Sequence, residues 1–326
     1  MSRSSAGSEA DLDAGTAIVA ALRAIGERLD TLEPASLADE PDAVHQLRTH
    51  VRRLRSVLAV YASVFDPSVA AALRRTYGAF GKELGTVRDI EVRVQVAERA
   101  LTEASGANRG SEASDAAASV SDTASASAPA EVAAARARLI ADELEAHRLA
   151  HARFAERQRM PRAVARRAAL AAFLAAPPFT SLASGPAVDV LGDLLQREAR
   201  RAGERADRID SSTGAEELHR VRKAGRRLRY ASEAVTEEPV TLFGDGARAL
   251  AHVGERLHDV LGDHRDEVLF AEHVRRAAAH AAHAGEPVGL LARLAEAAER
   301  RAAGRLDELP AVIEDLRDAG QEWAFR

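Results

Sequence analysis

The chain has 326 residues, of which 46% are apolar and 29% charged, and it contains no cysteine. This composition is typical of a globular protein with a sizeable core, and it excludes disulfides, thiolate metal sites and thiol nucleophiles. The formal net charge of −5 gives no global sign of a nucleic-acid or membrane binder, so any anion site must be local.

The N-terminal stretch MSRSSAGSEADLDAGT lacks the apolar segment of a secretory signal, and no apolar run approaches membrane-spanning length. We therefore expect a cytoplasmic protein without a membrane partner. Residues 1–11 are expected to be disordered, and the folded chain is expected to begin at about residue 12.

Apolar residues recur at three- and four-residue spacing along nearly the whole chain, and no stretch alternates as a strand does. We therefore predict an all-α protein. The first helix is expected from about residue 12 to 32 and to end at Glu33–Pro34. The second follows Pro41–Asp42, which suit a helix start, and runs to about Phe65; the third runs from about 69 to 101.

Residues 102–130 are rich in Ala and Ser and offer little to bury, so they are expected to form a flexible insert. Proline breaks and helical periodicity then divide the rest of the chain into further helices. These are expected at about 131–158, 161–176, 186–209, 215–237, 245–283 and 287–306.

Two basic runs share their residues at equal spacing: HQLRTHVRRLR from His45 and HRVRKAGRRLR from His219. The matched pairs are His45 with His219, Arg48 with Arg222, Arg52 with Arg226, Arg53 with Arg227 and Arg55 with Arg229. A second pair follows in the same order, LGTVRDIEV from Leu84 and LGDHRDEVL from Leu261. This order predicts an internal repeat, with one domain over residues 12–316 made of two helical halves, about 12–160 and 161–316.

Each basic run forms a helix with a cationic front and an apolar back. At about 100° per residue, the front of the first run carries one histidine and three arginines within roughly 80°. In the two runs these fronts consist of His45, Arg48, Arg52 and Arg55, and of His219, Arg222, Arg226 and Arg229. The backs consist of Leu47, Val51, Leu54 and Leu58, and of Val221, Ala224 and Leu228.

The fronts contain like charges one turn apart, which repel each other. Arg48 with Arg52 is one such pair, and neither run contains an acid. Either acids from other helices, such as Asp89 and Asp266, neutralise them, or an anionic ligand does. Guanidinium is always charged and presents a planar fork that matches phosphate oxygens, and a row of such forks suits a repeating anion. Histidine adds a donor whose charge depends on pH.

The motif H-x-x-R-x-x-x-R-R-L-R, followed by L-G-x-x-R-D and present twice in a helical chain, resembles the CHAD domain family. The resemblance runs from about Leu12 to the last predicted helix. It implies two pseudo-symmetric antiparallel four-helix bundles with a basic central channel that binds inorganic polyphosphate. Some members of the family associate with polyphosphate granules, so the resemblance also implies this location.

Carried over to this sequence, the resemblance implies a polyphosphate-binding set drawn from both basic runs. It comprises His45, Arg48, Arg52, Arg53, Arg55, His219, Arg222, Lys223, Arg226, Arg227 and Arg229. Arg88 and Arg265 of the L-G-x-x-R-D steps could reach the same channel, with a structural salt bridge to a neighbouring Asp as the alternative. The insert at 102–130 is not part of the family pattern.

We expect binding without catalysis, and no cofactor or metal. Acids such as Asp89, Asp259, Asp263 and Asp266 form no recognised metal loop, and there is no glycine-rich phosphate cradle. The histidines between residues 252 and 283 complete no recognised zinc spacing. The acid-x-acid-x-Lys strand of CYTH triphosphatases, to which CHAD domains are also fused, is absent. A phosphate-chain hydrolase is therefore the weaker alternative.

A general polyanion or nucleic-acid binder is the other alternative, because charge alone does not distinguish a phosphodiester from a phosphoanhydride. Three observations count against nucleic acid: the net acidity, the lack of a helix-turn-helix pattern, and the scarcity of stacking aromatics in the basic runs, where Tyr230 is the exception.

Overall fold

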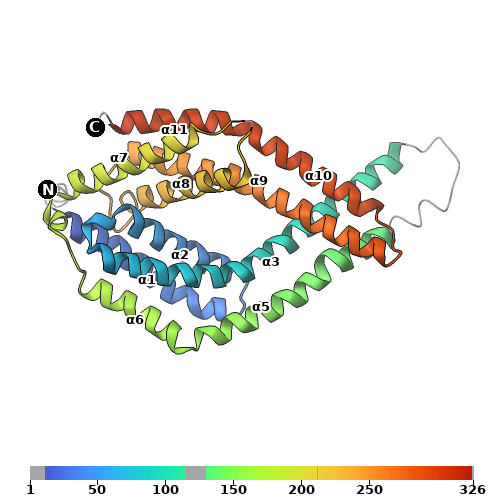
Figure 1. Ribbon diagram of the computed structural model, residues 1–326, viewed down its shortest axis with the longest axis horizontal. Helices are drawn as coiled ribbons and strands as arrows, with labels where there is room; N and C mark the ends of the chain where they lie inside the picture. The colour runs from blue at the N-terminus through green and yellow to red at the C-terminus, as the bar shows by residue number, and fades with distance from the viewer. Residues whose placement is uncertain (1–11, 115–129, 211, 325–326) are drawn as a thin grey trace, which may run out of the picture. The chain divides into compact units, whose positions relative to one another are not determined.

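A computed structural model describes residues 12–114, 130–210 and 212–324 (Figure 1). The expected disordered segment 1–11 and residues 115–129 of the expected insert lie outside the described residues. The rest is helical, and the described segments contain no β-strand beyond two isolated bridges, Asp13 with Pro186 and Phe65 with Phe179. The predicted all-α class is confirmed. No described helix has both the length and the apolarity to cross a membrane.

Long helices joined by short turns account for nearly all of the described chain. They are α1 (Ala14–Leu37), α2 (Ala43–Val60), α3 (Pro67–Ser114), α5 (Asp142–Gln158), α6 (Pro161–Ala175), α7 (Ala187–Ala206), α8 (Ala215–Glu233), α9 (Asp245–His283), α10 (Gly289–Arg305) and α11 (Leu309–Ala324). A π-helical turn, η2 (Ala137–Ala141), precedes α5, and the short 3₁₀ turns are η1 (Ala62–Val64), η3 (Ser181–Ser184) and η4 (Leu306–Glu308).

The chain divides into two compact units that do not follow its two sequence halves. Unit 1 comprises the chain up to Gly85, Phe154–Gly262 and the chain from Glu308 onward. Unit 2 comprises Thr86–Arg153 and Asp263–Asp307. Two of the four divisions fall within α3 and α9, directly after the glycine of each L-G-x-x-R-D step, and the other two fall within α5 and η4. Each unit therefore contains segments of both halves.

The core of unit 1 forms where the apolar backs of the basic helices pack on their neighbours. The α2 helix packs against α1 and α8, and α7 packs against α8 and α11. The predicted apolar backs of both basic helices are buried, as expected for amphipathic helices whose apolar side faces a core. This burial leaves the arginine fronts of α2 and α8 facing away from the core.

Unit 2 has a core of its own, built from the second parts of α3 and α9 together with η2 and α10. Leu101, Leu139, Phe270, Val274 and Ala298 are among its buried members. Burial of these apolar side chains in one cluster explains why the helical pattern continues into both long helices beyond the glycine steps.

Three helix ends differ from the sequence-based expectation by about five residues or more. The α1 helix continues through Pro34 to Leu37, because a proline in the last turn costs only one backbone hydrogen bond while Ser36 beyond it is buried. The α2 helix ends at Val60, where the short η1 turn takes over. The α3 helix extends to Ser114, into the segment expected to be a flexible insert, in line with the high helix propensity of alanine.

The last helix, α11, was not predicted from the sequence. Its buried residues Leu309, Val312, Leu316 and Trp323 recur at helical spacing, and Trp323 packs edge-on against Phe243 with ring centroids 5.0 Å apart. The Leu-Pro pair at the start of α11 resembles a helix-breaking signal, but proline is well suited to the first turn of a helix.

Candidate anion-binding site

Unit 1 contains a cavity of about 680 Å³ between α2, the first part of α3, and α8. We call it the basic cavity. Its lining residues are Arg48, Arg52 and Arg55 from α2, Ala71, Arg74, Arg75, Gly78, Ala79, Gly81 and Lys82 from α3, and His219, Lys223 and Arg226 from α8.

Every charged residue among the described lining residues of the basic cavity is a cation. Six arginines and two lysines contribute eight positive charges, a histidine adds a ninth basic group, and no described lining residue is acidic. Solvated helix surfaces ordinarily interleave opposite charges, because like charges in close proximity repel each other. A cavity of this composition is therefore suited to an anion with several charges.

Burial among other cations lowers the pKa of two of these arginines. Burial, with the neighbouring charges of Arg48 and Arg226, lowers the pKa of Arg52 to about 9. Burial likewise lowers the pKa of Arg226 to about 10, and Arg222, Arg55 and Arg48 act in the same direction. Both shifts mean that the folded chain disfavours the charged form, and a bound anion would reverse that effect.

Several of these arginines also lack carboxylate partners. Among the described residues, no Asp or Glu oxygen lies within 4.0 Å of the guanidinium groups of Arg52, Arg55, Arg74 or Arg226. The Nε atoms of Arg55 and Arg226 are buried without a hydrogen-bond partner. Buried donors in folded proteins are nearly always paired, so these two atoms indicate where an acceptor is to be expected.

Two glycines on α3 lie beside side chains of α2. A Cβ at Gly78 would lie 3.4 Å from Nη2 of Arg55, and a Cβ at Gly81 would lie 3.3 Å from Cγ1 of Val51. The Arg55 guanidinium thus lies beside α3 at Gly78, where a Cβ would make an ordinary van der Waals contact with it. Both glycines line the basic cavity.

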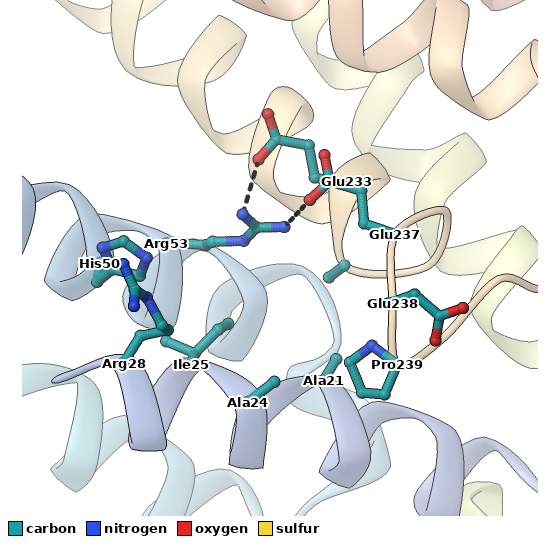
Figure 2. Close-up of a pocket in the computed structure, with 11 residues that line it drawn as sticks. Ala21, Ala24, Ile25, Arg28, His50, Arg53, Glu233, Glu237, Glu238 and Pro239 are labelled. Carbon is teal, nitrogen blue, oxygen red and sulfur yellow. Dashed lines mark hydrogen bonds and ion pairs between the residues drawn. The ribbon is translucent and has the colours of Figure 1, made fainter. Parts of the chain in front are cut away.

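Arg53 belongs to a different site, shown in Figure 2. Its Nη2 lies 2.6 Å from Oε2 of Glu237 and its Nη1 3.5 Å from Oε2 of Glu233. These residues line a smaller cavity of about 130 Å³ that also includes Arg28 and His50. Arg53 is therefore held by acids and does not line the basic cavity.

Arg227 and Arg229 are also paired with acids. The Arg227 Nε lies 2.5 Å from Oε1 of Glu198, whose side chain is only 3% exposed. Arg229 contacts Glu233 at 2.7 Å and Glu255 at 2.8 Å. Both arginines thus serve ion pairs within unit 1, although they belong to the predicted binding set.

Arg222 is not a lining residue of the basic cavity but lies close to it. Its Nε donates to the backbone oxygen of His258 at 3.3 Å, and its charge contributes to the lowered pKa of Arg52 and Arg226. His45, at the first turn of α2, is half-buried and likewise does not line the cavity.

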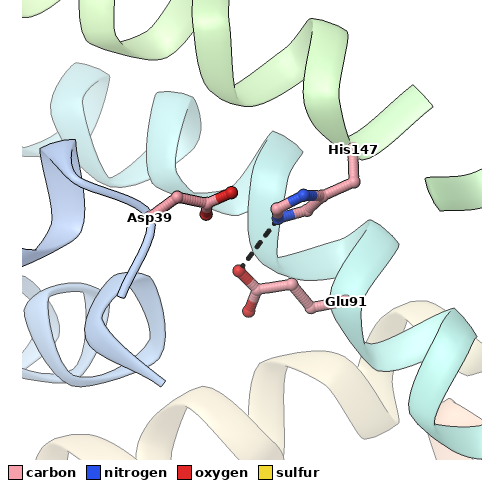
Figure 3. A group of neighbouring side chains, drawn as sticks. All are labelled: Asp39, Glu91 and His147. Carbon is pink, nitrogen blue, oxygen red and sulfur yellow. Dashed lines mark hydrogen bonds and ion pairs between the residues drawn. The ribbon is translucent and has the colours of Figure 1, made fainter. Parts of the chain in front are cut away.

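The two arginines of the L-G-x-x-R-D steps belong to unit 2. Arg88 Nη1 lies 2.9 Å from Oε2 of Glu91, and the other oxygen of Glu91 lies 3.3 Å from Nε2 of His147 (Figure 3). Arg88 thus forms a salt bridge, but its partner here is Glu91, one turn further along α3, and not the neighbouring Asp of the prediction. Arg265 is exposed on α9.

Sequence reasoning missed the α3 wall of the basic cavity, formed by Arg74, Arg75 and Lys82. These cations are spread over about two turns, in the stretch RRTYGAFGK, and do not form a dense run. The signal was their helical spacing together with Gly78 and Gly81, which places small residues and cations on one face of the helix.

The structure is thus that of an all-α protein with a strongly basic cavity between its helices. The sequence profile of the CHAD domain matches residues 20–275, and the chain belongs to the CHAD domain family.

Two curated relatives from Mycobacterium tuberculosis cover most of the chain. They are the uncharacterized protein MT2285 of strain CDC 1551 / Oshkosh and the uncharacterized protein Rv2226 of strain ATCC 25618 / H37Rv. Each is 27% identical over 311 residues, which is 91% of this chain and 54% of the relative. The chain therefore spans about half the length of the curated relatives it matches.

Two solved structures share the fold. The crystal structure of the CHAD domain from the plant Ricinus communis has a TM-score of 0.63 and 22% identity, covering 96% of this chain and 93% of that chain. PptA from Streptomyces chartreusis has a TM-score of 0.60 and 21% identity, covering 95% and 99%. At these identities the likeness concerns the fold.

Proposed function

We propose that the protein binds inorganic polyphosphate in the basic cavity and that binding involves no chemical step. The observation that carries this proposal is the lining itself: eight permanent positive charges around one cavity, with no acidic residue among the described lining residues. The buried, unpaired Nε atoms of Arg55 and Arg226 add donors that an anion would satisfy.

A chain of phosphates fits this lining better than a single phosphate does. Three helices contribute cations, with Arg52 on α2, Arg74 on α3 and Arg226 on α8 as examples. One phosphate group can be reached by only a few guanidinium forks at once, whereas a linear polyanion brings successive charges to all three walls. Release of the counterions of the polyanion adds a favourable entropy term.

The main alternative ligand is nucleic acid, which also presents phosphates to a cationic surface. Binding of single strands typically uses aromatic side chains on which bases stack. Tyr230, the one Phe, Tyr or Trp at the basic runs, is only 6% exposed, and no Phe, Tyr or Trp lines the basic cavity among the described residues. This supports an anion without bases.

A phosphate-chain hydrolase is the weaker alternative for this cavity. Enzymes that transfer phosphoryl groups with Mg²⁺ hold the ion through carboxylates as well as through the substrate. The described lining of the basic cavity offers arginine, lysine, histidine, glycine and alanine. Such a lining supports binding and retention of the anion.

The proposal is tested by titration calorimetry with long-chain polyphosphate, a single-stranded oligonucleotide and orthophosphate, each in about 150 mM salt. We expect tight binding of polyphosphate and much weaker binding of the other two. Equal affinity for the oligonucleotide would make the protein a general polyanion binder, and no binding to any of the three would overturn the proposal.

Binding of this kind would also bring the protein to polyphosphate granules in a cell that forms them. A fluorescent fusion should co-localise with the granules, and a fusion carrying glutamates at Arg52 and Arg226 should not. Equal localisation of both fusions would mean that another surface or partner determines the location.

A further inference from the structure

The glycines of the two L-G-x-x-R-D steps each contact an arginine of a basic run. A Cβ at Gly85 on α3 would lie 2.5 Å from Nη1 of Arg48, and a Cβ at Gly262 on α9 would lie 2.8 Å from Nη2 of Arg222. Carbon and nitrogen atoms that are not bonded do not approach so closely, because attraction is greatest at about 3.5–4.0 Å and turns to repulsion at much shorter distances. Each arginine can hold its position only because the residue opposite is glycine.

The two contacts are equivalent in the internal repeat. Arg48 and Arg222 are matched positions of the basic runs, and Gly85 and Gly262 are matched positions of the L-G-x-x-R-D steps. The same relationship thus occurs in both copies, once between α2 and α3 and once between α8 and α9. It gives a physical reason for the two motifs to occur together.

We propose that Gly85 and Gly262 are positioning residues for the guanidinium groups of Arg48 and Arg222. Each glycine leaves a space on the neighbouring helix in which the guanidinium lies against the backbone. For Gly85 the result is a fixed cation in the wall of the basic cavity, because Arg48 is one of its lining residues. The effect of Gly85 on affinity rests on the proposed function of that cavity.

An alanine at position 85 should displace Arg48 without unfolding the chain. The atom in its way is the end of a flexible side chain, and alanine has a higher helix propensity than glycine. Gly225 and Gly254 differ in this respect: a Cβ at Gly225 would lie 2.9 Å from the backbone oxygen of Gly254. Those two glycines allow α8 and α9 to approach, whereas Gly85 makes room for a side chain.

The test compares polyphosphate affinity in the wild type and in Gly85→Ala, Arg48→Ala and the double variant. Gly203→Ala on α7 is the matched control, since no atom lies within 4 Å of a Cβ there. We expect Gly85→Ala to weaken binding about tenfold, the size of one lost charge-assisted hydrogen bond. Gly203→Ala should have no effect. In the Arg48→Ala background, Gly85→Ala should cause no further loss, because its target is gone.

A second measurement reports the position of the Arg48 side chain directly. The NMR signal of the Arg48 Nε–Hε group should shift in Gly85→Ala and stay in place in Gly203→Ala, with or without ligand. If Gly85→Ala unfolds the chain, the same substitution is made together with Arg48→Lys, which removes the guanidinium. Recovery of helix content in this double variant would support a clash between the Cβ added at position 85 and the Arg48 guanidinium, and continued unfolding would contradict it.

Wild-type affinity in Gly85→Ala, or a full additional loss in the Arg48→Ala background, would overturn the positioning role while leaving polyphosphate binding intact. Failure of the wild type to bind polyphosphate would instead contradict the proposed function. In that case the Arg48 signal still decides whether Gly85 sets the position of the guanidinium: an unchanged signal in Gly85→Ala would overturn the inference.

Discussion

Arg52 and Arg226 occupy matched positions in the two basic runs, and both side chains line the basic cavity. Neither has a carboxylate within 4.0 Å among the described residues. The pKa of Arg52 is lowered most by burial, next by the charge of Arg48 and then by the charge of Arg226. The repeat thus brings two like charges to one cavity, and this arrangement leads to several testable consequences.

Replacing both Arg52 and Arg226 by glutamate should abolish polyphosphate binding. The change removes two cations from the lining of the basic cavity and places two anions there, so a polyanion is repelled. Circular dichroism should show the same helix content as in the wild type. The measurement is titration calorimetry with long-chain polyphosphate.

The matched control for this variant is Arg200→Glu with Arg248→Glu. Both side chains belong to unit 1 and are exposed, at 67% and 59%. The net charge changes by the same amount, but away from the basic cavity. Normal binding by the double variant at Arg52 and Arg226, or an equal loss in the control, would contradict the site assignment.

Polyphosphate affinity should fall steeply with salt. If all eight permanent cations of the cavity contact phosphates, the slope of log K against log salt is about −6 by analogy with single-stranded nucleic acids. Arg55→Gln should make the slope less steep by about one unit or somewhat less. The slope is measured by titrations between about 50 and 200 mM salt. A flat dependence would rule out an ionic site.

Arg52→Met should stabilise the ligand-free protein by about 1 kcal/mol and weaken polyphosphate binding. The physical reason is the removal of a partly buried cation that sits among others without an acidic partner. Thermal unfolding with and without polyphosphate measures both effects, and Arg200→Met provides the exposed control. A lower unfolding temperature for ligand-free Arg52→Met would contradict the electrostatic account.

His258 on α9 should make the stability of the protein depend on pH. Burial lowers its pKa from 6.5 to about 4, so between these values the unfolded chain binds a proton that the folded chain does not. The free energy of unfolding therefore falls as pH decreases from about 6.5 to about 4, by up to about 3 kcal/mol. Comparing urea unfolding of the wild type and His258→Gln isolates this contribution from that of the carboxylates. Identical pH profiles would show that His258 titrates normally.

Arg227→Ala should destabilise unit 1 rather than act on the ligand. It leaves the carboxylate of Glu198 buried without its closest partner, at a cost of about 3 kcal/mol. Arg227→Met with Glu198→Leu removes both charges and should recover most of the lost stability. Polyphosphate affinity of that double variant should remain within about threefold of the wild type, since Arg227 does not line the cavity. A large loss of affinity would place Arg227 in the binding set after all.

Much of the fold was predictable because the helical periodicity is strong. The expected bounds of α9 agree with the structure, and the apolar back of α2, with Leu47 and Leu54, is buried as predicted. The continuation of α1 was missed because Pro34 was interpreted as a helix end, and no helix was predicted beyond about residue 306, where α11 lies. Whether a proline ends a helix depends on its position in the turn and on the tertiary contacts of the residues around it.

The site was predictable only in part, because a helical face does not show what lies opposite. Arg52 and Arg53 are adjacent in sequence, yet Arg52 lines the basic cavity while Arg53 is paired with Glu237, which is remote in sequence. The α3 cations such as Arg74 reach the cavity through tertiary packing, which no single run of sequence shows. The fold determines the partners of a charged residue. The repeat alone therefore could not separate the arginines that line the basic cavity from those that are paired with acids.

The most direct measurement is a crystal structure of the protein with a short polyphosphate. The phosphate chain should lie between α2, α3 and α8, with its oxygens within hydrogen-bond distance of Arg52 and Arg226. A polyphosphate bound elsewhere on the protein, with the basic cavity free of anion, would contradict the central claim.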